Sequence, residues 1–414
     1  MPQELIYQHT FDNGLVLLGE PMPWLRSAAM AFMLPAGCRY EPANRLGLAG
    51  FANEMVQRGA GNYSSRDLVA VQDNLGIDRS SSISTSHASF GAAMPAESLL
   101  DALSVYAEIV LHPHLPSDQI DDARQLCLQE LHANEDDLPQ TLMNRLKQMH
   151  YGELLGRNSL GDEAGLLAID SNDVRSFFQQ RYRPGGSILA VAGNFDWRRV
   201  KDHVETLLSD WRPVEAEDEV QTSGDKGYQH IEHPSQQTHL GIAFPAVRYG
   251  DEDYYPMRAA VGVLSDGMSS RLFTRVREER GLCYTISAGC HSMREGGGVF
   301  CYAGTTVERA QETFDVTLRE LQAIADGVGD DELDRLKVRI QSSLIMEQES
   351  SASRASAIVS DWYLLGRIQS RDELQQKIDA LTTSDLIDYW KRCPPRDLRV
   401  VTVGPEALDV PMIA

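Results

Sequence analysis

Arg45-Leu-Gly-Leu-Ala-Gly-Phe-Ala-Asn-Glu-Met-Val-Gln-Arg-Gly59 is the stretch from which the fold of this chain is best argued. Its apolar side chains recur at helical spacing, and Gly59 is a typical helix end. Residues at i, i+3 and i+4 lie on one face of a helix, so Gly50, Asn53 and Glu54 are expected to lie together. We therefore predict a helix with one apolar face and a second face that carries three chemically unlike positions.

Length and composition predict a globular chain of more than one domain. The chain has 414 residues, of which 42% are hydrophobic and 24% charged; the composition is ordinary, but the length exceeds that of one ordinary domain. No apolar run approaches the ~20 residues of a membrane span, so no membrane partner is expected. The net charge of −22 argues against a nucleic-acid partner and is compatible with the attraction of basic peptides.

The cysteines and the first residues favour a cytoplasmic location. The six cysteines form no C-x-x-C pair, and most lie in apolar segments, so buried thiols are expected rather than a disulfide framework. The segment Met1-Pro-Gln-Glu-Leu-Ile has neither the basic nor the apolar region of a signal peptide, although a chain trimmed of one would look the same. Both features fit a reducing compartment.

An internal repeat divides the chain into residues 1–212 and 227–414, joined by an acidic linker over 213–226. Ser171-Asn-Asp-Val is matched by Thr383-Ser-Asp-Leu, and the strand that ends at Gly193 is matched by one that ends at Gly404, 211 positions later. Self-similarity at half the chain length indicates two copies of one α+β domain, each a mostly antiparallel sheet packed against helices. Chance similarity between two unrelated mixed domains is the lesser alternative.

The order of elements in the first copy follows from periodicity and turn residues. We predict strands over 15–18 and 28–33, two more between 81 and 94, and helices over 99–111 and 116–135. A shorter helix is expected from Pro139. Ser171-Asn-Asp173 is expected to cap a helix that runs to Arg181, ahead of a strand over 187–193.

The frame Gly-Leu-Ala-x-x-x-x-x-Met-x-x-x-Gly of the opening stretch resembles the zinc-site helix of the insulinase/mitochondrial-processing-peptidase superfamily, the inverted zincins. Active members carry His-x-x-Glu-His there, in which two histidines bind zinc from one helix face and the Glu acts as general base. At those positions this chain has Gly50, which has no side chain, Asn53, which has no titratable group, and Glu54, which offers one carboxylate. The resemblance therefore implies the scaffold of the peptidase without its chemistry.

The third zinc ligand of the family is a Glu on a later helix, and Arg124-Gln-Leu-Cys-Leu-Gln-Glu130 resembles that segment. Glu54 and Glu130 together supply two oxygens and no nitrogen, which is a poor zinc site. We expect no metal and no other cofactor in this chain, and no catalytic residue. The other histidine candidates are more often structural or surface residues; they are His112-Pro-His114, His132 with Glu135, and His230 with His233.

A second motif, Asp266-Gly-Met-Ser-Ser-Arg-Leu-Phe-Thr-Arg-Val-Arg-Glu-Glu-Arg-Gly-Leu-Cys-Tyr-Thr285, resembles the signature of the superfamily's C-terminal domain. In active members an Arg and a Tyr seven positions apart hold the substrate backbone and stabilise the oxyanion. Arg277 and Tyr284 occupy those positions, and both are fixed donors suited to a developing negative charge. The alternative is that Arg277 pairs with a neighbouring Glu and that Tyr284 belongs to a strand core.

The resemblance spans nearly the whole chain and is to half-length members such as mitochondrial processing peptidase subunits and their bacterial relatives. It implies a non-catalytic subunit of a heterodimeric zinc metallopeptidase, which binds peptide beside a homologous, zinc-bearing partner. The alternative is a structural or peptide-binding homodimer without proteolysis, like the core subunits of respiratory complexes. The segment Leu264–Met268 is too short for the glycine-rich loop of the non-catalytic mitochondrial subunit, which argues against presequence presentation through it.

Overall fold

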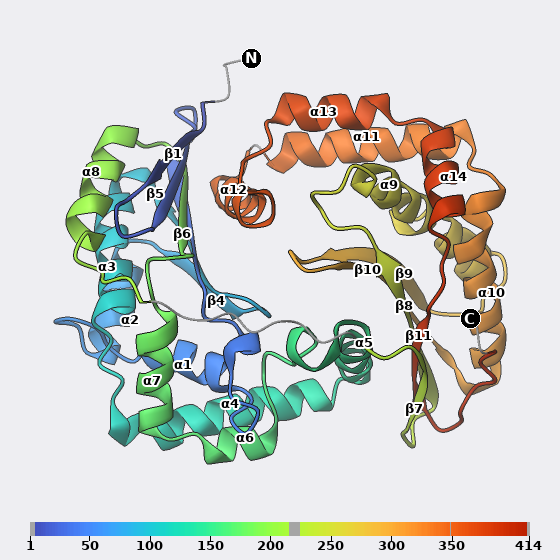
Figure 1. The fold of residues 1–414 in the computed structure, drawn as a ribbon, viewed down its shortest axis with the longest axis horizontal. Coiled ribbons are helices and arrows are strands. Elements are labelled where there is room, and N and C mark those ends of the chain that lie inside the picture. Colours follow the sequence, from blue (N-terminus) through green and yellow to red (C-terminus); the bar gives the residue numbers. More distant parts are fainter. Residues whose placement is uncertain (1–4, 215–223, 348, 412–414) are drawn as a thin grey trace. The chain divides into compact units, whose positions relative to one another are not determined.

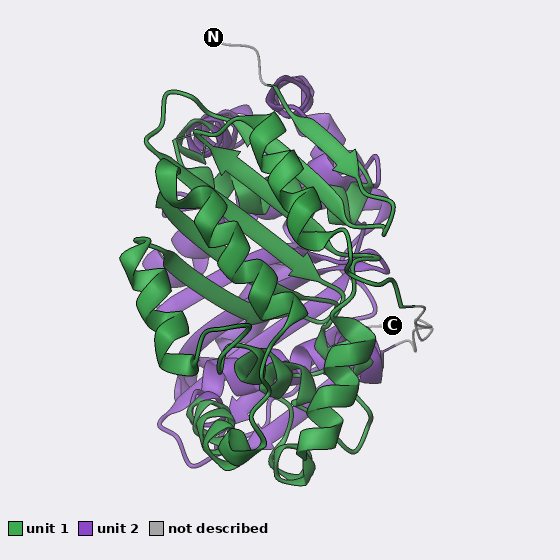
Figure 2. Cartoon of the chain, turned by 90° about the vertical axis from the view of Figure 1, so that its left-hand side faces the viewer, with its two compact units in different colours: residues 1–133, 157–220, 345–369 green, residues 134–156, 221–344, 370–414 purple. Residues whose placement is uncertain are grey.

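A computed structural model describes residues 5–214, 224–347 and 349–411. Most of the expected linker, residues 215–223, lies outside the described residues. The chain forms two compact units, which Figure 2 shows in green and purple and which are described separately. Unit 1 comprises residues 1–133, 157–220 and 345–369, and unit 2 comprises the rest. Within the described ranges, no helix combines the length and apolar character that crossing a membrane requires.

Unit 1 is built on a six-stranded mixed sheet with the order β1-β2-β6-β3-β5-β4 (Figure 1). All neighbouring strands are antiparallel except β2 and β6, which are parallel. The strands are β1 (Tyr7–Thr10), β2 (Val16–Pro21), β3 (Ser27–Leu34), β4 (Asp78–Ile83), β5 (Ala88–Pro95) and β6 (Ile188–Gly193).

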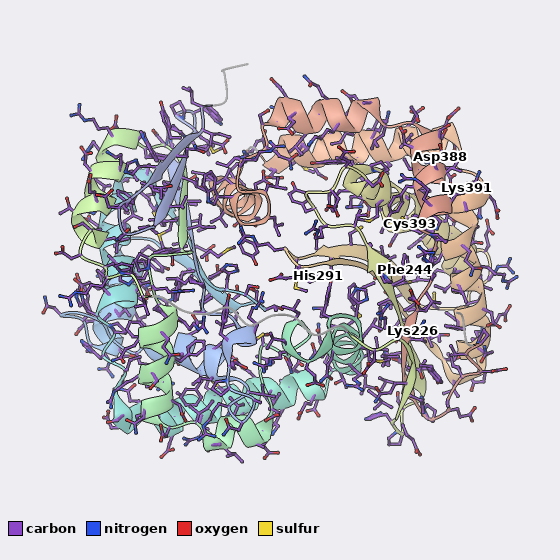
Figure 3. The ribbon with its side chains drawn as sticks, in the orientation of Figure 1. Lys226, Phe244, His291, Asp388, Lys391 and Cys393 are labelled. Carbon is purple, nitrogen blue, oxygen red and sulfur yellow. The ribbon has the colours of Figure 1, made fainter. Side chains whose placement is uncertain are left out.

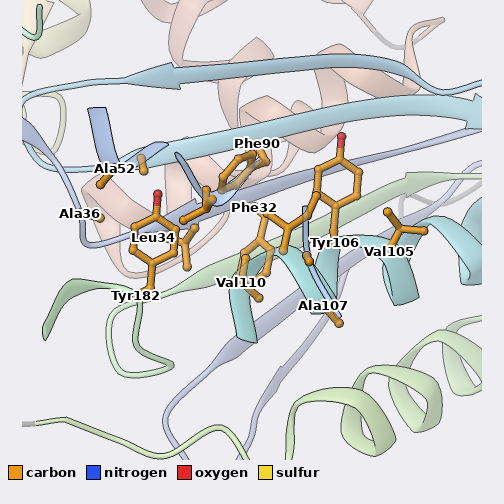
Figure 4. Close-up of a cluster of buried hydrophobic side chains, with 14 of the residues drawn as sticks. Phe32, Leu34, Ala36, Ala52, Phe90, Val105, Tyr106, Ala107, Val110 and Tyr182 are labelled. Atoms are coloured by element: carbon orange, nitrogen blue, oxygen red, sulfur yellow. The ribbon is translucent and has the colours of Figure 1, made fainter. Parts of the chain in front are cut away.

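The two faces of this sheet carry separate hydrophobic clusters, because successive strand residues point to opposite sides. From β3, Met30 and Phe32 face the main core, where Phe90 of β5 and Tyr106 also lie (Figure 4). Ala31 faces the second cluster, which packs against α12. The helices of the unit are α1 (Leu48–Val56), α2 (Ser65–Asn74), α3 (Leu99–Leu111), α4 (Ile120–Glu135), α6 (Glu163–Ala168), α7 (Ser171–Arg181), α8 (Trp197–Leu208) and α12 (Ser351–Leu365).

Unit 2 repeats this arrangement with five strands in the order β7-β11-β8-β10-β9. Only β7 and β11 are parallel, as β2 and β6 are in unit 1. The strands are β7 (Gly227–Glu232), β8 (Gln237–Ala246), β9 (Thr285–Ser292), β10 (Gly297–Thr306) and β11 (Arg399–Gly404). The helices are α5 (Leu138–Leu155), α9 (Tyr254–Ser265), the π-helix η4 (Phe273–Glu278), α10 (Ala310–Gln322), α11 (Asp330–Glu347), α13 (Arg371–Ala380) and α14 (Thr383–Arg392).

The predicted α+β duplication is confirmed by these two sheets, which share strand order and strand directions apart from β1, which has no counterpart in unit 2. The strands of unit 1 all precede the expected linker and those of unit 2 all follow it, but each unit also contains one helix from the other side of the linker. Helix α5 precedes the linker and packs on β8 and β11, whereas α12 follows the linker and packs on β3 and β6. Small residues permit these close contacts: a Cβ at Gly241 of β8 would lie 2.4 Å from the side chain of Leu142 in α5.

Helix α12 is also fixed to its sheet by a buried ion pair. The guanidinium of Arg354 donates from Nε and Nη2 to Glu20 on β2 over 2.8 and 2.7 Å, and both residues are more than nine-tenths buried. A third contact joins Arg354 to Glu347 at 3.3 Å. Removing one member of a buried pair is strongly destabilising, so this contact holds α12 in place.

Two local predictions were wrong. The helix expected to be short after Pro139 is α5, which has 18 residues and is interrupted by non-helical backbone at Gly152. The cap of α7 is Asp170 rather than Ser171: its carboxylate accepts from the backbone N–H of Asp173, while the Asp173 side chain accepts from the Asp170 N–H. Asp at a cap position satisfies the free N–H groups of the first turn.

Candidate functional site

Helix α1 is positioned by a buried carboxylate that lies before it in sequence. Gly47 precedes the helix with φ of +94°, a conformation that favours glycine. Glu41, 4% exposed, accepts hydrogen bonds from the backbone N–H of Gly47 (3.0 Å) and of Ala49 (2.8 Å). Burial raises the pKa of the Glu41 carboxyl to about 8, against the opposing effect of these two bonds. Arg157 fixes the same segment by donating to the Glu41 carbonyl at 2.6 Å.

No role was assigned to Glu41 from the sequence. Its acidic side chain near a helix start could have indicated a capping role, since a carboxylate suits the four unpaired N–H groups and the positive end of the helix dipole. Its distance from the helix in sequence hid it, because the usual capping residues immediately precede the first turn.

The structure brings together the four positions that the sequence resemblance predicts to be a degenerate zinc site. Gly50, Asn53 and Glu54 of α1 line one cavity of about 220 Å³ with Glu130 of α4. Helix α4 is held in place by Arg124, whose guanidinium donates to the carbonyls of Ile169 (2.8 Å) and Leu166 (3.2 Å). The Arg of the quoted Arg-x-x-x-x-x-Glu segment therefore orients the helix that presents Glu130.

Each polar side chain of α1 in this cavity has a specific environment. Asn53 is 7% exposed, and its amide donates to the hydroxyl of Ser81 at 3.2 Å. Its oxygen Oδ1 is buried and has no hydrogen-bond partner among the residues that the structure describes. Glu54 forms an ion pair with Arg58, one turn further along α1, through Oε1 at 3.0 Å.

Glu130 contributes an exposed carboxylate on the α4 side of the cavity. Partial burial raises its pKa, and the negative charge of Glu54 raises it further. Cys127, one turn earlier on α4, also lines the cavity, and burial together with Glu130 and Glu54 raises the pKa of its thiol to about 12. The cavity is therefore acidic and oxygen-rich, with a protonated thiol at neutral pH.

These residues do not fit a catalytic zinc ion. A peptidase zinc needs three protein ligands, of which the helix face should supply two imidazoles, and Gly50 supplies nothing. Asn53 cannot take a proton, and Glu54 is already paired with Arg58. Across the described parts of the chain, no three His, Cys, Asp or Glu residues are placed to hold a metal ion.

The histidines weighed as substitutes have other partners. His112 contacts Glu108 at 3.0 Å, and His114 hydrogen-bonds the carbonyl of Gly61 at 2.8 Å. His230 on β7 hydrogen-bonds the hydroxyl of Thr402 at 2.9 Å. These contacts are those of structural and surface residues.

Part of the second motif is structural. Arg271 is 6% exposed and binds Glu332 in a bidentate ion pair, with contacts of 2.7 and 2.6 Å, and it also donates to the carbonyl of Gly327 at 2.8 Å. The hydrogen bond from Arg271 lowers the pKa of Glu332. The Ser-Arg-Leu-Phe portion of the signature therefore fixes the start of α11 to the segment after α9.

Arg277 and Tyr284 lie on the exposed part of the same motif. Arg277 is exposed on the π-helix η4, and its guanidinium lies 4.6 Å from the ring centre of Phe273. Tyr284 immediately precedes β9, is 45% exposed, and donates to the side-chain carbonyl of Gln237 at 2.8 Å. Neither half of the alternative is seen, since Tyr284 is outside the core and Arg277 forms no ion pair within the described residues. π-Helical turns are frequent at functional sites.

Sequence reasoning missed the polar chain behind Tyr284. Its hydroxyl also hydrogen-bonds Tyr302 of β10, whose hydroxyl in turn contacts His239 of β8 at 2.8 Å. Burial raises the pKa of Tyr284, so the phenol is a hydrogen-bond donor at neutral pH. No local pattern could reveal this chain, because its members come from β8, β10 and the residue before β9.

Two repeated α+β sheets, with a zinc-helix scaffold in the first and an exposed Arg/Tyr motif in the second, define the class of metallopeptidase-like proteins. Two family models agree with this: "Insulinase (Peptidase family M16)" matches residues 21–163, and "Peptidase M16 inactive domain" matches residues 168–339. Together they match well over half of the chain, which belongs to the M16 insulinase family.

Individual relatives match along the full length. An uncharacterized zinc protease of Bacillus subtilis is 26% identical over 410 residues, which is 97% of this chain and 98% of the relative. Among solved structures, the peptidase M16 inactive domain from Pseudomonas fluorescens has a TM-score of 0.90 at 20% identity, covering 98% and 99% of the two chains. A chain of complex III2 from Candida albicans has a TM-score of 0.83 at 17% identity, covering 96% of each. These structures show the shared fold.

Proposed function

We propose that this chain is the non-catalytic subunit of a heterodimeric zinc metallopeptidase. It would bind peptide and complete the substrate chamber beside a homologous, zinc-bearing subunit. The observation that carries the proposal is the combination of two sites in one chain. The cavity at Gly50, Asn53 and Glu54 has no histidine on its helix face, whereas Arg277 and Tyr284 remain exposed.

The proposed role of Arg277 and Tyr284 is to contact the substrate backbone and the oxyanion that develops on the scissile carbonyl. Both side chains carry donors that are fixed by local contacts, Arg277 by Phe273 and Tyr284 by Gln237. Preorganised donors stabilise a developing negative charge without reorganisation during the reaction. A cytoplasmic location is part of the same proposal, and it is compatible with six free cysteines.

A structural or peptide-binding homodimer is the second candidate. Its support is the likeness in fold to a chain of complex III2 from Candida albicans. A purely structural role needs neither an exposed Arg277 nor an exposed Tyr284, so the first candidate explains more of the surface.

Recovery of the native complex distinguishes the two. The tagged chain should be purified from its own cells, and the associated proteins identified by mass spectrometry. We expect a homologous subunit that contains an intact His-x-x-Glu-His. The chain purified alone should contain no stoichiometric zinc and should cleave no peptide. A homodimer without such a subunit, or about one zinc per chain, would contradict the proposal.

Substitution of the Arg/Tyr pair tests the role directly. Arg277→Ala or Tyr284→Phe, each assayed in the recovered complex, should lower kcat by ~10²–10³, the usual effect of removing one oxyanion donor. Assembly and thermal stability should be almost unchanged, because both side chains are substantially exposed. Arg280→Ala is the matched control, since it removes an exposed Arg from the same segment. If all three variants turned over substrate as fast as the wild-type complex, only a scaffold role would remain.

A further inference from the structure

The cavity in unit 1 has two chemically different parts. Its polar part is formed by Asn53, Glu54 and Glu130, with the serines at 81 and 82 beside them. Its other walls are apolar and are formed by Phe51, Ile83, Leu126, Leu160 and Leu166. Leu126 is 38% exposed, so an apolar wall reaches the surface of the chain. An occupant that matches both parts has an aliphatic stem and a charged or polar head.

The oxygens in the polar part call for a positive head group. The carboxylate of Glu130 has no ion pair and no hydrogen bond within the described ranges, and Arg58 contacts only Oε1 of Glu54. Asn53 adds an independent observation, because it is more than nine-tenths buried and its Oδ1 has no hydrogen-bond partner among the described residues. A buried acceptor without a donor is costly, and a ligand with N–H donors would satisfy it.

An organic cation suits these donors and acceptors better than a metal ion does. Hard divalent cations take about six oxygens, and this cavity offers two carboxylates, one of which already contacts Arg58. A bare ion would also leave the apolar walls and most of the 220 Å³ unused. An alkylammonium or guanidinium group brings several N–H donors, and its methylene stem can contact the leucines.

We propose that this cavity binds the lysine or arginine side chain of a peptide. The charged head contacts the carboxylates of Glu54 and Glu130 and donates to Oδ1 of Asn53, while the stem lies against the apolar walls. The positions that would hold zinc in an active relative then serve as a subsite for a basic residue. This inference deepens the proposed function, because it names the class of peptide that the chain binds, and the net charge of −22 favours such peptides at longer range.

The test uses the full chain alone, so it does not depend on a partner subunit. Two fluorescent peptides of otherwise neutral sequence, one with a single lysine and one with norleucine in its place, are titrated with the chain at low salt in EDTA. The lysine peptide should bind roughly tenfold tighter or more, which is the range of a hydrogen bond to a charged group. Failure of the partner recovery described above, with this preference intact, would refute the subunit assignment and leave the subsite standing.

Variants assign the preference to the cavity. Glu130→Gln should reduce the difference between the two peptides to roughly twofold, whereas Asn53→Asp, which adds a carboxylate, should increase it. Asp122→Asn, an exposed position on the same helix, is the matched control and should leave the preference unchanged. Equal binding of both peptides, no binding of the lysine peptide, or an unchanged preference in Glu130→Gln would each overturn the proposal.

Discussion

Acidification from about pH 7.5 to about 5.5 should destabilise unit 2 through two buried histidines. His150 at the end of α5 and His291 of β9 lie in one aromatic cluster with Tyr151 and Phe300, and Figure 3 labels His291. His150 donates to the carbonyl of Gly297 at 3.3 Å, and Tyr151 contacts His291 at 2.7 Å. Burial lowers the pKa of each imidazole to about 4.

The sign of the effect follows from proton binding. Below the unfolded-state pKa of 6.5 the unfolded chain takes up protons that the folded chain does not accept until about pH 4. The stability contribution is therefore complete above about pH 6.5 and is lost as the pH falls toward 4. Between about pH 7.5 and 5.5, each histidine should remove about 1.3 kcal/mol from the free energy of unfolding. His291 is partly exposed, so its share should be the smaller one.

His150→Phe isolates one of the two contributions. It keeps a ring against Tyr151 and Phe300 and removes a buried Nδ1 that has no partner among the described residues. Urea unfolding at several pH values, kept above the sequence pI of about 4.9, should show that the variant loses about 1.3 kcal/mol less than the wild type between about pH 7.5 and 5.5. His112→Gln, at an exposed site, should keep the wild-type pH dependence. A His150→Phe variant with an unchanged pH dependence would refute the assignment.

Three further predictions concern the scaffold and the cavity. Restoring His-x-x-Glu-His over residues 50–54 should give measurable zinc by elemental analysis. Glu130 remains, and a Cβ at Gly50 would meet only the carbonyl oxygen of Ser159, at 3.4 Å. Zinc-free protein would show that the groups that orient the ligands are also lost. Arg354→Met should cost about 3–5 kcal/mol and expose α12 to protease, and adding Glu20→Leu should recover much of the loss; a double variant no more stable than the single one would contradict this. Arg271→Lys should cost about 1–3 kcal/mol in urea unfolding, because an ammonium cannot reproduce the bidentate contact, whereas Arg275→Lys, at a more exposed ion pair, should cost less than about 1 kcal/mol.

The elements themselves were predictable where one periodicity runs unbroken. The helix over 99–111 matches α3 (Leu99–Leu111), and the strand over 28–33 lies inside β3 (Ser27–Leu34). What periodicity could not supply is the partner of each apolar face. The apolar side chains of α5 and α12 predict burial, but no sequence pattern within either helix indicates that it packs on the sheet of the other copy.

The site was predictable at the level of position and not at the level of contacts. Helical spacing placed Gly50, Asn53 and Glu54 on one face, and the structure lines one cavity with them and Glu130. The bond from Asn53 to Ser81 was beyond reach, since it joins α1 to a strand 28 positions away. The ion pair of Glu54 with Arg58 is different, because i,i+4 spacing could have indicated it.

The polar side chains of α1 that line the cavity are held by specific contacts. Asn53 is tied to Ser81, which also accepts a bond from Gln57, and Glu54 is tied to Arg58. Gly50 does not have the positive φ that would demand glycine, and a Cβ there would make an ordinary contact with Ser159. Packing and backbone conformation therefore do not require glycine at this position. What its missing side chain provides is space in the cavity that Glu130 also lines, which a binding site needs and which a repacked core would have filled.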